Sequence, residues 1–187
     1  MLIRFNLISI FENVKVLFVF SILALIYSCQ DAKYTLDNPF DPENMNLDPP
    51  ALFFHPFEVT KTFGESVVVE IYGLELDPAS AAHLDIRYDW GSVKVDSVLA
   101  GPFFEGENDP IEITVDEQGV LDIFIYYLPD MISNQNLGGT WSLATVYFST
   151  VSTGESELLF GENTTLRDEN NISLEIRQYG SGYINVE

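Results

Sequence analysis

The stretch Ala82–Gly101, with the sequence AHLDIRYDWGSVKVDSVLAG, indicates the fold class, because two alternating runs surround a turn. Successive side chains of a β-strand point to opposite faces of the sheet. The first run therefore has one apolar face, with Leu84, Ile86 and Tyr88, and one polar face, with His83, Asp85 and Arg87. After the turn, the run that starts at Val93 alternates in the same way. Each run predicts a strand with one buried and one solvated face.

Further short runs follow one another to the C-terminus, and glycine or proline residues separate many of them. We expect strands over residues 57–61, 67–71, 111–115, 120–128, 140–150, 156–160, 172–178 and 183–186. No segment of this region shows a convincing helical period. Many short strands separated by turn residues are typical of an all-β sandwich. The sequence thus predicts one β-sandwich of about nine strands, over residues 53–187.

The chain is strongly acidic. Its 187 residues include 29 acidic and 8 basic side chains, which give a formal net charge of -21 at pH 7. Such a chain repels both a nucleic-acid backbone and an anionic membrane surface, so we expect neither as a partner. The simplest interpretation is that the negative charge keeps the protein soluble. The alternative is a surface that binds calcium or a basic partner.

The N-terminal residues 1–28 have the pattern of a secretory signal. An apolar run from Val16 to Tyr27 follows the basic residues Arg4 and Lys15. This run is too short to cross a bilayer as a lone helix, which needs about 20 residues. Positive charge, a short apolar run and a small residue at its end predict a signal peptide. A transmembrane anchor is the alternative.

Cys29 is the single cysteine of the chain, and it directly follows the apolar run. The segment Leu25–Cys29, LIYSC, resembles the lipobox of bacterial lipoproteins, although Tyr27 is bulkier than the residue usually found there. The resemblance implies that Cys29 is lipidated and becomes the N-terminus of a protein anchored outside the cytoplasm, with the outer membrane expected. Acyl chains bury enough methylene groups to hold a protein on a bilayer. An ordinary signal peptide with an incidental cysteine is the alternative.

Residues 29–52 are predicted to form a tether. The segment contains Pro39, Pro42, Pro49 and Pro50 and shows little apolar periodicity. Proline restricts its own backbone and that of the preceding residue, so the segment should be a semi-rigid spacer. Its acidic and amide side chains lack the spacing and central glycine of a helix-loop-helix calcium loop, so no metal site is predicted.

Five segments, taken in order, are similar to those of a known module. They are Leu84–Asp89, Val93–Gly101, Leu143–Phe148, Leu166–Asn171 and Gly182–Val186. Together they resemble the cohesin domain, a jelly-roll module within the superfamily of carbohydrate-binding sandwiches. One departure is Trp90-Gly91, where the family usually continues with a proline and a leucine-bearing turn. The resemblance implies a jelly-roll sandwich that binds dockerin-type protein modules, without catalysis, in the context of polysaccharide binding or breakdown.

The same resemblance implies a docking face on two strands. Carried over by position, this face comprises His83, Asp85, Arg87, Asp122, Phe124 and Tyr126. Strand alternation independently places these residues on the side away from the core. The run 120–128 is apolar on both faces. It is therefore either a central strand covered on both sides, or a strand with an exposed apolar stripe at which a partner docks.

Two other functions use the same fold. A carbohydrate-binding module would bind a glycan through planar aromatic side chains, for which the candidates are Trp90, Phe103, Phe104 and Trp141. A structural or assembly lipoprotein would bind no small ligand. Catalysis is not predicted, because the chain has 2 histidines that are not four residues apart, and it has no nucleophile elbow or phosphate-binding loop. We therefore expect no cofactor.

Overall fold

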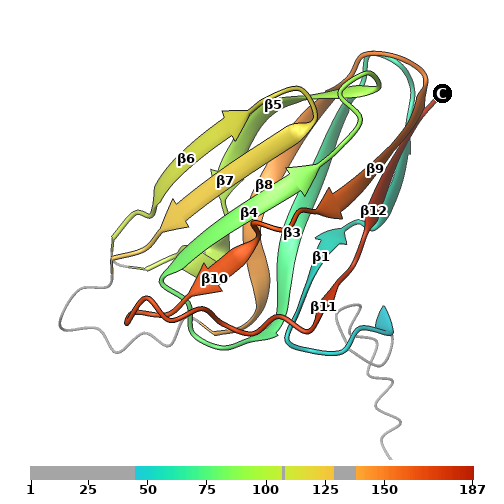
Figure 1. The fold of residues 1–187 in the computed structure, drawn as a ribbon. Coiled ribbons are helices and arrows are strands. Elements are labelled where there is room, and N and C mark those ends of the chain that lie inside the picture. The colour runs from blue at the N-terminus through green and yellow to red at the C-terminus, as the bar shows by residue number, and fades with distance from the viewer. Residues whose placement is uncertain (1–44, 107, 129–137) are drawn as a thin grey trace, which may run out of the picture. The chain divides into compact units, whose positions relative to one another are not determined.

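Two β-sheets face each other across a shared apolar core (Figure 1). The computed structural model describes residues 45–106, 108–128 and 138–187. Cys29, the predicted signal peptide and most of the predicted tether lie outside these residues. Within the described part of the chain, no helix is long and apolar enough to cross a membrane.

Sheet I contains β11, β1, β3, β8 and β5 in that spatial order. The bounds of these strands are Gln178–Tyr179 for β11, Ala51–His55 for β1, Ser66–Leu76 for β3, Gly139–Thr150 for β8 and Val93–Ala100 for β5. All neighbours are antiparallel except β1 and β11, which are parallel. A short 3₁₀ helix, η1 (Pro102–Phe104), follows β5.

Sheet II contains β2, β12, β9, β4, β7 and β6 in that order, and β10 pairs with β4 beside β9. The bounds are Glu58–Lys61 for β2, Gly182–Val186 for β12, Gly154–Phe160 for β9, Ala81–Arg87 for β4, Val120–Tyr126 for β7, Ile111–Asp116 for β6 and Thr165–Arg167 for β10. The pair β2–β12 is parallel and the others are antiparallel. The predicted all-β jelly-roll sandwich is confirmed.

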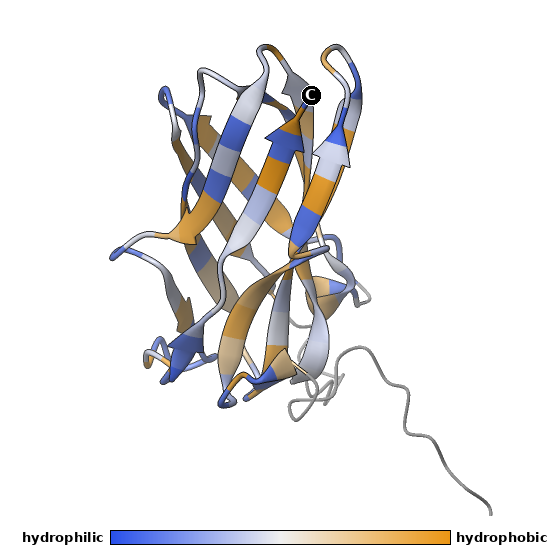
Figure 2. Ribbon diagram, turned by 90° about the vertical axis from the view of Figure 1, so that its right-hand side faces the viewer, coloured by the Kyte–Doolittle hydropathy of each residue, from blue (hydrophilic) through white to orange (hydrophobic). Residues whose placement is uncertain are grey.

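The core forms because alternate side chains of both sheets point inward. On β7, Leu121, Ile123 and Ile125 are fully buried, and on β4 Leu84 and Ile86 are buried as predicted. Hydrophobic and hydrophilic residues alternate along the strands in Figure 2. Burial of these apolar side chains between the two sheets is the main force that holds the sheets together.

A tight turn sets the register of β6 and β7. Glu117 and Val120 exchange backbone hydrogen bonds around the two residues Gln118 and Gly119, whose φ angles are 48° and 96°. Turns with positive φ at both central residues match the twist of antiparallel strands. The turn places Ile113 opposite Phe124 across the two strands.

One predicted strand is wrong. Residues 172–178 were expected to form a strand, but the structure shows only an isolated bridge at Ser173 and the short strand β11 at the end of this range. Leu174 and Ile176 nevertheless pack against the core. Ile172, the first residue of the alternating row, is exposed, so the alternation reflects the inward packing of Leu174 and Ile176, which an extended segment achieves without a neighbouring strand along its length.

The end of the predicted tether belongs to the sandwich. β1 begins at Ala51, inside the range 29–52 assigned to the tether, and Ala51 and Leu52 are fully buried. Met45 and Leu47 pack on a small cluster on the outside of sheet I, formed by Ala51, Phe53 and Leu74. Arg177 donates a hydrogen bond to the carbonyl of Pro49 at 3.1 Å. The segment that leads into the sandwich is therefore attached to sheet I.

Candidate protein-docking face

The strands β4, β7 and β6 bring their outward side chains together on one face of sheet II, because residues paired across antiparallel strands share a face. The paired rows on this face are Ile111–Tyr126–Ala81, Ile113–Phe124–His83 and Val115–Asp122–Asp85. We call this surface the outer face of sheet II. The side chains of all six predicted docking residues are directed to this side of the sheet, and Arg87, paired with Val120, lies at its end.

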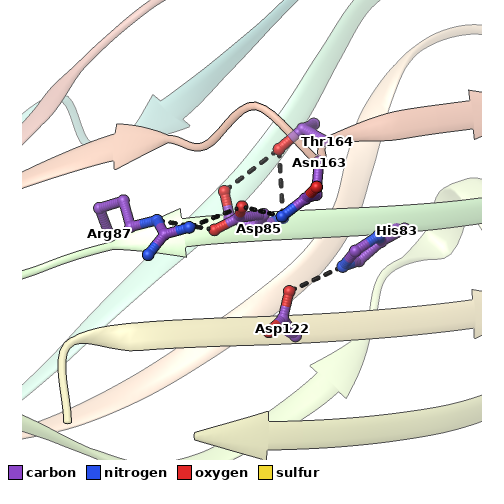
Figure 3. A network of polar contacts seen from close by, with 6 residues as sticks. All are labelled: His83, Asp85, Arg87, Asp122, Asn163 and Thr164. Carbon is purple, nitrogen blue, oxygen red and sulfur yellow. Dashed lines mark hydrogen bonds and ion pairs between the residues drawn. The ribbon is translucent and has the colours of Figure 1, made fainter. Parts of the chain in front are cut away.

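The structure brings three of the predicted residues into direct contact. His83 Nε2 lies 2.7 Å from Asp122 Oδ1 (Figure 3), and the imidazole stacks on the Phe124 ring with centroids 4.2 Å apart. The side chains of His83 and Asp122 are 23% and 27% exposed. These contacts hold the three side chains in one arrangement at the centre of the face, so little conformational freedom remains to be lost on binding.

Asp85 has a different role from the predicted one. Its side chain is completely buried, and Arg87 donates to Oδ2 at 3.0 Å while Arg87 Nε lies 3.0 Å from Oδ1 (Figure 3). Asn163 Nδ2 also donates to Oδ2, at 3.0 Å. A buried carboxylate requires such partners, because an unpaired charge in the interior is costly.

The segment from Gly161 to Thr164 covers Asp85. Gly161 N–H donates to the Asp85 carbonyl at 2.7 Å, and the Asp85 N–H donates to Thr164 Oγ1 at 3.1 Å. A Cβ atom on Gly161 would lie 2.3 Å from Asp85 Cγ, so only glycine fits above the carboxylate. The prediction that Asp85 contacts a partner is therefore contradicted by its burial, and its side chain holds this loop against β4.

Sequence reasoning missed the aliphatic residues of β6. Ile111, Ile113 and Val115 are 52%, 52% and 42% exposed. An alternating run such as IEITV normally predicts that the apolar row is buried. The row is exposed here because it pairs with the outward row of β7 at the margin of the sheet. No local signal distinguishes the two cases.

These residues form one surface with the aromatic residues of β7. We define the apolar strip as Ile111, Ile113, Val115, Phe124 and Tyr126. Tyr126 is 44% exposed, and Phe124 is half-buried against the His83 ring. The second apolar row of the run 120–128 is therefore not covered in this structure, which agrees with the exposed stripe of the second alternative. A contiguous exposed apolar patch marks a place where a partner binds.

The hydroxyl of Tyr88 ties β6 to the rest of the sheet. It donates a 2.7 Å hydrogen bond to Asp116 Oδ1 at the end of β6. Burial, followed by this hydrogen bond, raises the pKa of the Tyr88 hydroxyl above its ordinary value. Tyr88 therefore remains protonated near neutral pH and can serve as the donor that fixes the end of the strip.

The four aromatic residues proposed for glycan binding do not form one surface. Phe103 and Phe104 are buried in the core, so their assignment to a glycan site is wrong. Trp90 and Trp141 are 48% and 55% exposed. Trp141 lies near the start of β8, whereas the turn with Trp90 is joined through the Ser92 carbonyl to Val151, just beyond its end. The two indoles are therefore at opposite ends of a strand.

The acidic segment after β10 forms an ordinary turn. Asp168 Oδ1 accepts hydrogen bonds from the N–H groups of Asn170 and Ile172, at 2.9 and 2.7 Å. An aspartate commonly closes a turn in this way. In the described ranges of the chain, no three histidine, cysteine, aspartate or glutamate side chains lie together so as to hold a metal ion.

The sequence matches no known family profile and no curated protein. Its structure is similar to a non-cellulosomal cohesin from the archaeon Archaeoglobus fulgidus, with a TM-score of 0.59 and 14% identity over 73% of this chain and 90% of that one. It is also similar to the sixth cohesin of scaffoldin B from Acetivibrio cellulolyticus in complex with a Cel5 dockerin mutant, with a TM-score of 0.60 and 19% identity over 73% and 98% of the two chains.

A third similar structure is the third cohesin of ScaC from Acetivibrio cellulolyticus, in complex with the ScaB dockerin. It has a TM-score of 0.57 and 18% identity, over 72% of this chain and 98% of that one. At these identities the similarity concerns the fold. The chain therefore has a cohesin-like fold.

Proposed function

We propose that the apolar strip binds a dockerin-like protein module and that the protein is a non-catalytic recognition module. The observation that carries this proposal is the exposure of the strip on the outer face of sheet II. The cohesin-like fold supports it, because two of the similar structures are cohesins in complex with dockerins.

The physical properties of the face suit a protein partner. Interfaces concentrate their binding energy in a few central apolar or aromatic side chains surrounded by polar ones. Here Tyr126 and the aliphatic residues of β6 supply the apolar centre, and the His83–Asp122 pair lies next to it. A sheet with fixed side chains is preorganised, which reduces the entropy lost on binding.

Isothermal titration calorimetry with a panel of dockerins, with calcium and with a chelator, tests this proposal. The variant Tyr126→Ala should weaken binding at least about tenfold, as expected for an aromatic residue at the centre of an interface. Trp141→Ala is the matched control, because Trp141 is a similarly exposed aromatic on sheet I, and it should leave the affinity unchanged. Absence of binding to every dockerin, or equal loss in both variants, would contradict the proposal.

The same two variants distinguish a protein partner from a glycan. If an array of polysaccharide fragments detects binding that Trp141→Ala abolishes and Tyr126→Ala does not, the protein is a carbohydrate-binding module instead. Binding of a dockerin through the strip would be consistent with a role in polysaccharide binding or breakdown. A protein that binds neither class of ligand would be a structural lipoprotein.

We further propose that Cys29 carries a lipid anchor and that the sandwich lies outside the cytoplasm, on the outer membrane. The proposal is supported by the lipobox-like segment Leu25–Cys29. Mass spectrometry of the mature protein should find residue 29 at the N-terminus with acyl chains attached. The variant Cys29→Ser should lose the acyl chains. An unmodified Cys29 in the mature wild-type protein would refute this anchor.

A further inference from the structure

The outer edge of β6 is open. Sheet II ends at β6, and no strand of the described ranges pairs with its second edge (Figure 1). All residues of β6 except Glu112 are exposed. The backbone groups along this edge can therefore form hydrogen bonds to another strand.

This edge lacks most of the features that prevent pairing with another chain. Edge strands are commonly protected by charged side chains, above all lysine, by inward-pointing charges, by prolines or by β-bulges, and of these β6 has the acidic side chains of Glu112 and Asp116 on its inner row. β6 has the sequence IEITVD, without lysine or proline, and its register with β7 is continuous from Ile111 to Asp116. The aliphatic row of the strand is also exposed. An open, regular and apolar edge is suited to adding one more strand.

We propose that β6 pairs antiparallel with β6 of a second copy of this chain, in the register centred on Ile113. In that register Ile113 lies opposite its own copy, and Ile111 lies opposite Val115 of the second copy. The aliphatic rows of the two strands thus face each other, and apolar pairs across antiparallel strands are stabilising.

The positions of the acidic residues select this register. When the pairing is centred on Ile113, Glu112 lies opposite Thr114 of the second copy. When it is centred on Thr114, Glu112 lies opposite Asp116, and like charges directly opposite each other are destabilising. The strand is therefore self-complementary in one register, which favours a second copy over an unrelated strand as the occupant.

Such a dimer leaves the docking face open. Antiparallel pairing of identical strands places the two-fold axis perpendicular to the sheet, so the outer faces of both copies point to the same side. Sheet I of both copies, with the attached segment Met45–Pro50, then lies on the other side. Two copies could bind partners side by side, which would increase the avidity of binding.

The dimer should be weak and should strengthen with salt. A single short strand buries less area than a stable interface requires. The net charge of -21 on each chain opposes association, and salt screens this repulsion. Binding of a basic partner would show the opposite salt dependence, so salt separates this association from electrostatic binding.

Cysteine cross-linking in the full chain tests the register. Cys29→Ser is included so that the introduced cysteine is the sole thiol. Opposite Cβ atoms in an antiparallel pair are about 4.5–5.5 Å apart, and a disulfide needs about 3.5–4.5 Å between them, so a small movement of the two strands allows the bond. Ile113→Cys should form a disulfide with itself, whereas Ile111→Cys and Val115→Cys should cross-link efficiently only when mixed.

Val68→Cys is the matched control, because Val68 is 45% exposed on the outer side of sheet I. Cross-linking at Val68 as efficient as at Ile113 would show random collision and overturn the proposal.

Sedimentation velocity of the Cys29→Ser chain in detergent gives a second readout. Its average mass should rise with protein concentration and with salt, and Ile113→Lys should remain monomeric. A chain that is monomeric at every concentration and salt would also overturn it.

Discussion

At the residue scale, Asp85 shows what strand alternation can and cannot predict. The pattern of the run His83–Tyr88 correctly placed His83, Asp85 and Arg87 on the face away from the core. It could not show that the loop at Gly161 covers Asp85, because residues that are distant in the sequence create this contact. His83 and Asp122 came from different runs, and their 2.7 Å contact likewise depended on the register between strands.

The close approach of Gly161 to Asp85 leads to a double-mutant prediction. Gly161→Ala should destabilise the protein by about 1–3 kcal/mol, because the added methyl group forces the loop away from the carboxylate. Asp85→Ala opens space below the loop. In that background Gly161→Ala should lower the free energy of unfolding clearly less than it does in the wild-type protein. Urea unfolding of the single and double variants measures the coupling. Glu162→Ala, at the neighbouring exposed position, is the control and should have little effect. If the effects of Gly161→Ala and Asp85→Ala on the free energy of unfolding are strictly additive, the two positions do not interact.

At the element scale, the β6–β7 hairpin was largely predictable and its exposure was not. The segment Asp116–Gly119 with apolar runs on both sides predicts a turn between two strands, as observed. The aliphatic row of β6 was not identified as a surface, because its exposure depends on the position of the strand at the margin of sheet II. Sheet order is a property of the whole chain and has no local signature.

The conformation of the hairpin turn predicts that substitutions at the adjacent residues Gln118 and Gly119 have different effects on stability. Gly119→Ala should be destabilising by about 1–3 kcal/mol, since its φ of 96° is unfavourable for alanine and the added Cβ would lie 2.7 Å from the Tyr88 carbonyl. Gln118→Gly should be neutral or slightly stabilising, because Gln118 already has a φ of 48°. Thermal unfolding of the two variants measures this difference. Equal destabilisation would mean that the positive φ angles are unimportant.

At the scale of the whole molecule, two features of the sandwich lie on different sheets. Sheet I carries the segment Met45–Pro50, through which the chain enters the sandwich, and sheet II carries the apolar strip. A partner that binds sheet II therefore meets no obstruction from this segment. The all-β fold could be predicted from the alternating runs, whereas the assignment of these features to opposite sheets needed the strand order.

The most direct test of the docking face is methyl NMR of the protein with the tightest-binding dockerin of the panel. We expect the methyl signals of Ile111, Ile113 and Val115 to shift on binding, because the partner covers the apolar strip. The signals of Val68 and Leu99, which are exposed on sheet I, should not change. Shifts at Val68 and Leu99 with unchanged signals from the strip at saturation would show that the partner does not bind the outer face of sheet II.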